Sequence, residues 1–186
     1  MVNAVSLVNA SSRKRVVDLN PYANFERPFR PGDQAVFGKL TQGLVGERCT
    51  RWRGTFAGGL ILDFGALVSD TNRRFPNLSQ DRGESVLSTW GCDVVGSQGG
   101  HVLVDSRKDD SKAVTHFVSL LVGSMVEDLM LEPADLSLTI VFSNTRQLEL
   151  RTDPADPDLD QWFIELPNGC SVGASASGRW HVNSQS

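Results

Sequence analysis

Hydrophobic and polar positions alternate most clearly between residues 136 and 142. The apolar residues there are Leu136, Leu138, Ile140 and Phe142, and the intervening residues are Ser137, Thr139 and Val141. A period of two is typical of a half-buried antiparallel strand, because successive side chains point to opposite faces of a sheet. Weaker alternation predicts further strands near 47–53, 60–68, 86–95, 101–105 and 125–131, and around Leu148 and Leu150, Trp162, Ile164 and Leu166, and Cys170, Val172 and Ala174.

A helical period appears just before the strand predicted near 125–131. One apolar face at i, i+3, i+4 and i+7 is formed by Val114, Phe117, Val118 and Leu121. This spacing predicts a helix over about 111–122, capped by Asp110 or Ser111 and ended by Gly123 in the left-handed conformation. A shorter helix is expected over about 36–44.

The same succession of features occurs twice along the chain. The first copy contains Leu44-Val45-Gly46, Leu60, Leu62, Phe64, Trp90 and Gly96, and the second contains Leu121-Val122-Gly123, Leu138, Ile140, Phe142, Trp162 and Gly169. Two copies are too few for a solenoid. We therefore expect an α+β fold in which two pseudo-symmetric copies of a helix plus an antiparallel β-meander share one core. Phe64 and Phe142, and likewise Trp90 and Trp162, are expected to fill equivalent places.

The length of 186 residues suits one domain. Residues 36–186 are predicted to form this single duplicated domain, with copy one at about 36–110 and copy two at about 111–182. Residues 1–35 lack the repeat and contain several prolines, so we expect an extended N-terminal arm. Val2, Val5, Leu7 and Val8 could add an edge strand, and the arm could thread onto a neighbouring subunit.

The net charge of −4 is unevenly distributed. Side-chain counts give about +2 for residues 1–38, +3 for 39–82, −5 for 83–146 and −4 for 147–186. One copy is therefore basic around its first hairpin and the other is acidic throughout. Such asymmetry can steer an oppositely charged partner, although it is also compatible with an ordinary solvated surface.

Two charged clusters are candidate partner-binding sites. The acidic cluster is Asp153, Asp156, Asp158 and Asp160, and the basic cluster contains Arg51, Arg53, Arg73 and Arg74. The acidic loop lacks the D-x-D-x-D-G pattern of a calcium loop, so no metal site is assigned. Arginines around Trp52 could bind phosphates and stack on bases. However, Trp52 aligns with Leu129 of the second copy, which indicates a buried ring, and nucleic acid is not expected as a partner.

Catalytic signatures are not recognised in the sequence. The histidines His101, His116 and His181 form no metal-ligand pattern, and the serine elbow G-x-S-x-G is absent. The glycine-rich segments at 54–59 and 96–100 lack the features of a phosphate-binding loop. No catalytic residue and no cofactor are assigned. An enzyme whose site is assembled from separate strands remains an alternative, which a deep pocket holding His101 or His116 against a carboxylate would favour.

The three cysteines, Cys49, Cys92 and Cys170, are widely spaced and lie in apolar stretches. Without a C-x-x-C pair they are expected to be buried thiols, not zinc ligands. No segment approaches 18 apolar residues and no secretion signal is recognised, so a cytoplasmic protein is expected.

The motifs that recur in the two copies resemble those of a broad group of small uncharacterised bacterial proteins. The resemblance covers about residues 38–182 and depends on Leu44-Val45-Gly46, Leu60 to Gly65, Asp109-Asp110, Leu121-Val122-Gly123, Leu136 to Phe142, Trp162 and Pro167-Asn168-Gly169. Some members of the group are associated with polymorphic-toxin immunity. The chain departs from the group at Gly91-Cys92, where a basic residue is more usual. The resemblance implies no catalytic residue.

These observations favour a non-catalytic protein-binding module, of immunity or accessory type, that docks on a partner protein. The acidic cluster would steer the encounter with a basic partner. The alternatives are the enzyme described above and a subunit of a larger assembly that uses the N-terminal arm.

Overall fold

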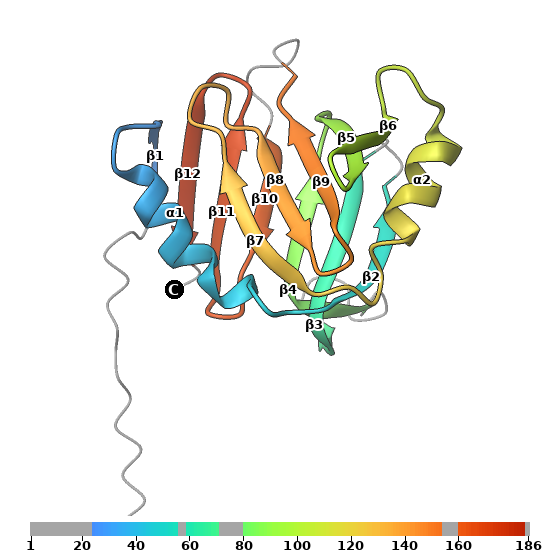
Figure 1. Cartoon of the computed structure of the whole chain (residues 1–186). Helices are drawn as coiled ribbons and strands as arrows, with labels where there is room; N and C mark the ends of the chain where they lie inside the picture. The colour runs from blue at the N-terminus through green and yellow to red at the C-terminus, as the bar shows by residue number, and fades with distance from the viewer. Residues whose placement is uncertain (1–23, 56–58, 71–79, 154–159, 185–186) are drawn as a thin grey trace, which may run out of the picture.

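The computed structural model describes residues 24–55, 59–70, 80–153 and 160–184. This part of the chain forms two antiparallel β-sheets and two short α-helices, α1 (Asp33–Thr41) and α2 (Ser111–Ser119), with a 3₁₀ turn at Gln42–Leu44 (Figure 1). The predicted antiparallel α+β class is confirmed. No helix in these residues is long and apolar enough to span a membrane.

The larger sheet has seven strands in the order β1-β12-β11-β10-β4-β3-β2, and the smaller has five in the order β6-β5-β9-β8-β7. The strand bounds are β1 Phe25–Pro28, β2 Cys49–Gly54, β3 Leu60–Asp70, β4 Gln80–Thr89, β5 Asp93–Gln98, β6 His101–Asp105, β7 Val126–Leu131, β8 Leu138–Phe142, β9 Arg146–Arg151, β10 Asp160–Glu165, β11 Cys170–Ser175 and β12 Arg179–Ser184. The chain changes sheet twice after β3, because β5 follows β4 into the smaller sheet and β10 follows β9 back into the larger one.

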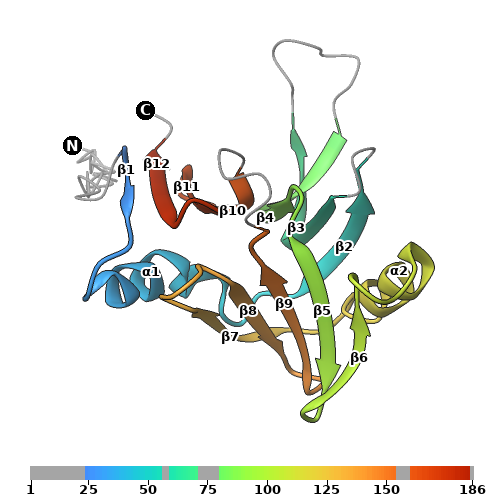
Figure 2. The ribbon, with the colours of Figure 1, turned by 90° about the horizontal axis from the view of Figure 1, so that it is seen from above.

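The core lies between the two sheets, and both helices lie on the side of the larger sheet that faces the smaller one (Figure 2). Phe37 of α1 packs against Trp162 of β10 with ring centroids 6.3 Å apart. The indole of Trp162 also donates a hydrogen bond of 2.8 Å to the carbonyl of Leu136, which precedes β8 of the smaller sheet. Trp162 therefore ties the two sheets together as well as filling the core.

A short crossing joins the start of β2 to the start of β7. Two backbone hydrogen bonds run from the amides of Gly46 and Cys49 to the carbonyls of Val126 and Ser124, at 2.8 and 2.9 Å. Two others run in the opposite direction, from the amides of Gly123 and Val126 to the carbonyls of Cys49 and Glu47, at 2.7 and 2.8 Å. The first hairpin has a register shift between Cys49 and Arg51, and the second has one between Val126 and Asp128. The starts of the two hairpins are therefore joined by reciprocal backbone hydrogen bonds, and each hairpin has a register shift close to its start.

Several boundaries differ from those predicted. The helix predicted over 111–122 ends at Ser119, although Asp110 caps it by accepting a 2.9 Å bond from the Ala113 amide and Gly123 has φ of +90°. The helix predicted over 36–44 begins earlier, at Asp33. Within the stretch predicted as an arm, Phe25–Pro28 pairs with β12 as an edge strand. Val2, Val5, Leu7 and Val8 lie outside the described residues.

The single strand predicted at 86–95 is wrong, because it consists of two strands that belong to different sheets. The chain turns at Trp90-Gly91 between β4 and β5, and Trp90 is 42% exposed whereas Trp162 is fully buried. The predicted equivalence of Trp90 and Trp162 is therefore wrong. Phe64 and Phe142 are both fully buried, and each lies beside the shifted register of its hairpin.

Candidate functional site

We call the face of the larger sheet that points away from the core the outer face. It carries most of the polar and charged side chains of that sheet. Alternation along β10 places Trp162 and Ile164 in the core and Phe163 and Glu165 on the outer face. No helix of the described chain covers this face (Figure 2).

Six strands contribute one residue each to a continuous row across the outer face. Successive partners in this row are His181, Gly173, Phe163, Ser88, Ile61 and Arg53. A neighbouring row contains Asn183, Ser171, Glu165, Val86, Asp63 and Arg51. Adjacent strands are about 4.8 Å apart, so each row spans about 24 Å from β12 to β2. The outer face is thus wide enough for a macromolecular contact.

Two predicted residues, Arg51 and Arg53, lie together at the β2 end of these rows. Both bind the fully buried carboxylate of Asp63: Arg51 Nε is 2.8 Å from Oδ2, and Arg53 Nη2 is 3.1 Å from Oδ1. The amide of Gly83 donates a further bond of 2.9 Å to Oδ1. Arg51 also donates to the carbonyl of Asp81. A buried charge is costly unless it is paired and hydrogen-bonded, and these donors satisfy Asp63.

The two arginine side chains remain about 30% exposed while their head groups are held by Asp63. Because their geometry is fixed before any partner arrives, they would lose little conformational entropy on binding. Two cations share one carboxylate, so the cluster of Arg51, Arg53 and Asp63 is itself positively charged.

The middle of the outer face combines an ion pair with apolar side chains. Arg82 of β4 pairs with Glu165 of β10, which joins the two strands at the centre of the sheet. Phe163 and Ile61 are half-buried in the adjacent row. Aromatic and arginine side chains are enriched where protein partners bind tightly.

His181 of β12 lies at the other end of the first row, and its side chain is close to that of the predicted residue Asp160 at the start of β10. The two side chains are 3.4 Å apart, measured from Nδ1 to Oδ1. The His181 ring lies against Gly173, where an added Cβ would be only 2.7 Å from Cε1. Glycine at this position therefore allows the imidazole to lie on the sheet. An imidazole beside a carboxylate is also half of a general acid–base arrangement.

Of the remaining predicted site residues, the structure describes Asp153. The backbone amide of Asp153 donates a hydrogen bond of 2.9 Å to Gln161 Oε1. Asp156, Asp158, Arg73 and Arg74 lie outside the described residues. Of the eight predicted partner-binding residues, Arg51, Arg53 and Asp160 are brought to one face.

His101 and His116 are both exposed, at the start of β6 and on α2 respectively. Neither forms an ion pair with a carboxylate in the described ranges, and His181 is the histidine that does. The described residues also contain no cluster of three His, Cys, Asp or Glu side chains suited to a metal.

The sequence patterns grouped Arg82 with the other basic residues of the first copy, but they gave His181 no role and did not indicate Ile61, Phe163 or Glu165. One signal was present, since Trp162-Phe163-Ile164 is a run of three apolar residues within a strand. Alternation requires that one residue of such a run face away from the core. The partners of Arg82 and His181 depend on strand order, which no local pattern contains.

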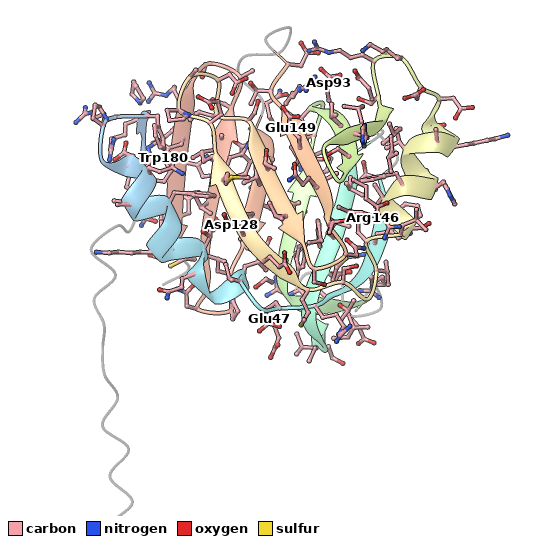
Figure 3. All side chains as sticks on the ribbon, viewed as in Figure 1. Glu47, Asp93, Asp128, Arg146, Glu149 and Trp180 are labelled. Atoms are coloured by element: carbon pink, nitrogen blue, oxygen red, sulfur yellow. The ribbon has the colours of Figure 1, made fainter. Side chains whose placement is uncertain are left out.

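The outer face of the smaller sheet has a different character. Asp128 and Glu149 lie on it toward the viewer (Figure 3). Arg151 Nε is 2.7 Å from Glu149 Oε1. The hydrogen bonds with Glu149, and to a lesser extent the charges of Asp105 and Asp93, raise the pKa of the Arg151 guanidinium. Asp128 and Glu149 come from the two acidic segments of the chain, residues 83–146 and 147–186 respectively.

The cysteines are free thiols; Cys49 and Cys170 are buried and Cys92 is half-buried. Burial raises the pKa of both Cys49 and Cys92 to about 12. Both thiols are therefore protonated near neutral pH, so neither is an activated nucleophile.

Comparisons with protein-family models, curated proteins and solved structures gave no match to this chain.

Proposed function

We propose that this chain is a non-catalytic protein-binding module, of immunity or accessory type, that acts in the cytoplasm by docking on a partner protein. The outer face of the larger sheet is the binding surface. The observation that carries the proposal is the anchoring of Arg51 and Arg53 on buried Asp63, in rows that also present Ile61 and Phe163. Rigid arginines next to half-buried apolar side chains supply both parts of a typical protein-binding hot spot.

Charge is divided along the outer face in a way that would orient a partner. Arg51 and Arg53 lie on β2 at one edge of the sheet, whereas Asp160, the last residue of the predicted acidic cluster, lies at the start of β10 beside His181 of β12. A partner with an acidic patch facing Arg51 and Arg53 and a basic patch facing Asp160 would be steered into one orientation. Because the head groups are held in place, docking would need little rearrangement.

We also infer that the two halves are copies related by an approximate twofold axis at the β2–β7 crossing. The reciprocal hydrogen bonds there and the matching register shifts support this inference. Superposing residues 33–64 on 110–142 in a crystal structure tests it. Phe64 and Phe142 should coincide, and unrelated positions would contradict it.

The binding surface is tested with full-length protein immobilised beside two variants. Phe163→Ala removes an apolar contact from the outer face, and Met130→Ala removes one from the 43% exposed Met130 on the smaller sheet. A protein captured from host lysate is identified, purified and titrated against all three. Phe163→Ala should weaken binding by about tenfold or more, whereas Met130→Ala should leave it unchanged. Equal affinity of all three for the purified partner would reject the outer face.

Charge is tested separately on the Arg82–Glu165 pair. Arg82→Glu should weaken binding of that purified partner, and the double variant Arg82→Glu/Glu165→Arg restores the internal pair with its charges exchanged. If the pair contacts the partner, the double variant stays weak although its stability recovers. Recovery of both affinity and stability would mean that the pair only supports the fold.

The His181–Asp160 pair is the observation that favours an enzyme as the second candidate. His181→Gln and Asp160→Asn would then abolish turnover of a substrate found by screening hydrolysable esters and phosphate esters. Turnover that survives both substitutions would exclude this pair as the catalytic group. The arm could still join subunits, which the mass in solution with and without residues 1–23 would report.

A further inference from the structure

A pocket of about 360 Å³ lies between the β2–β3 hairpin and α2, away from the outer face. It is formed where the two sheets diverge beside the helix. Its volume is equivalent to about twelve water molecules and lies at the lower end of the range for small-molecule sites.

The lining of the pocket combines apolar and polar side chains. Its apolar part is formed by Trp52, Leu60, Val94, Val114 and Val118, with the Cys92 thiol beside them. Polar atoms come from Thr55, Ser106, Asp109, Ser111 and Thr115. A mainly apolar cavity with a few polar groups is typical of a binding site for a small organic molecule.

Charge is nearly absent from the described lining. Asp109 is the one charged residue in it, and its Oδ2 already accepts a hydrogen bond of 2.8 Å from the Asp105 amide. No cation among the described residues lines the pocket, so a negatively charged ligand would lack a partner.

The corresponding place in the other half of the molecule is filled. The inferred duplication aligns Val114 of α2 with Phe37 of α1, 77 residues earlier, as Leu121 aligns with Leu44. Trp162 lies opposite Thr89 at the end of β4, and Val94 lies opposite Leu150 near the end of β9. Phe37 and Trp162 are fully buried against each other. Two valines thus stand where two aromatic rings close the other half.

We propose that this pocket binds a small, uncharged aromatic molecule in contact with Trp52, in the place that Phe37 and Trp162 occupy in the other half. The comparison between halves rests on the inferred duplication, but the pocket itself does not. The site is also independent of the outer face, so each proposal can fail without the other.

Binding is tested with 5-fluoroindole as the probe, observed by fluorine NMR with the full chain. The wild type should broaden and shift the probe signal in a saturable manner. Val114→Phe and Val94→Trp fill the pocket as the other half is filled, and each should abolish saturable binding. Val102→Phe adds the same ring at a 64% exposed position on β6 and should bind as the wild type does.

Trp52→Leu supplies a milder change, since Leu129 is the aligned residue of the other half. It should weaken 5-fluoroindole by about tenfold, because an aromatic contact and apolar area are lost. Indole-3-acetate should bind the wild type at least about tenfold more weakly than 5-fluoroindole, because its carboxylate finds no cation. Equal or tighter binding of indole-3-acetate would overturn the uncharged class.

Cys92 gives a second readout that needs no substitution in the pocket. N-ethylmaleimide is applied at pH 9, and alkylation of Cys92 is followed by peptide mass spectrometry. Saturating 5-fluoroindole should slow this alkylation about tenfold, because the probe would cover the thiol. Cys92 lines the pocket and is the least buried of the three cysteines, which makes it the reporter.

Two results would overturn the proposal. The first is that Val114→Phe and Val94→Trp both keep the wild-type circular dichroism spectrum and still bind the probe saturably. The probe would then bind outside this pocket. The other is the absence of both a saturable NMR shift and Cys92 protection in the wild type. If a filling variant does not fold, the Trp52→Leu titration and the protection of wild-type Cys92 decide the question.

Discussion

At the scale of single residues, the outer face depends on one buried carboxylate. Asp63 is fully buried, yet each of its oxygens has a donor within 3.1 Å. The sequence places Asp63 between Leu62 and Phe64 and so predicts that it points away from the core. It does not predict the two arginine partners, because they are set by the register of β2 against β3.

Asp63→Ala should lower the free energy of unfolding by about 3 kcal/mol, since it leaves two paired arginines and a backbone amide without their acceptor. The half-exposed Asp160 is the control, and Asp160→Ala should change stability by less than about 0.5 kcal/mol. Urea unfolding followed by tryptophan fluorescence measures both. Similar losses in the two variants would contradict a structural role for the Asp63 network.

At the scale of elements, α2 packs where the backbone of β5 is free of a side chain. A Cβ added to Gly96 of β5 would lie 2.4 Å from the ring of Phe117, so the helix rests on a position that has no side chain. The strand predicted near 86–95 stops just before Gly96, whereas β5 continues through it to Gln98. In the structure only the end of the glycine-rich segment at 96–100, Gly99-Gly100, turns between β5 and β6.

Gly96→Ala should destabilise the protein by about 1–3 kcal/mol, because α2 must move away from β5. Gly38→Ala is the matched control: it lies within α1 and an added Cβ would meet nothing within 4 Å. Alanine favours helix over glycine, so Gly38→Ala should stabilise the protein by up to about 1 kcal/mol. Thermal unfolding should give shifts of opposite sign, and two destabilising shifts of equal size would contradict the packing argument.

A second element-scale contact fastens β1 to the start of α1. Arg27 binds Asp33 through its two terminal guanidinium nitrogens, Nη1 and Nη2, at 2.6 and 2.7 Å, and its guanidinium carbon lies 4.8 Å from the Phe25 ring centroid. The hydrogen bonds from Arg27 lower the pKa of Asp33 below its ordinary value. The prolines of this stretch led to the prediction of an extended arm, whereas Phe25–Pro28 forms a strand.

The pKa of Asp33 makes this contact dependent on pH. A carboxyl whose pKa is lower in the folded state adds stability above its unfolded pKa of about 3.9, and this stability disappears as the pH falls through the folded pKa. Asp33→Asn should therefore lower the free energy of unfolding at pH 7. Between about pH 5 and pH 2, the free energy of unfolding of this variant should fall less than that of the wild type. Parallel urea titrations across this range check the difference, and identical pH profiles would contradict it.

At the scale of the whole molecule, local patterns predicted the elements much better than their assembly. The alternation around Leu138 and Ile140 and the cap at Asp110 depend on neighbours in sequence, and both were predicted correctly. The change of sheet at Trp90-Gly91 was not predicted, because the sheet that each strand joins is set by partners distant in sequence, β10 for β4 and β9 for β5. The site was found in part for the same reason: Arg51 and Arg53 stood out as charges, whereas Phe163 and His181 joined them only through strand order.

The central claim is that a partner docks on the outer face of the larger sheet, and photo-crosslinking in the native host tests it most directly. The full chain is expressed with p-benzoyl-phenylalanine at position 163 on the outer face, or at position 130 on the smaller sheet. After irradiation, position 163 should give a discrete crosslinked product with one host protein, and position 130 should not. No product from position 163, or the same product from both positions, would contradict the account.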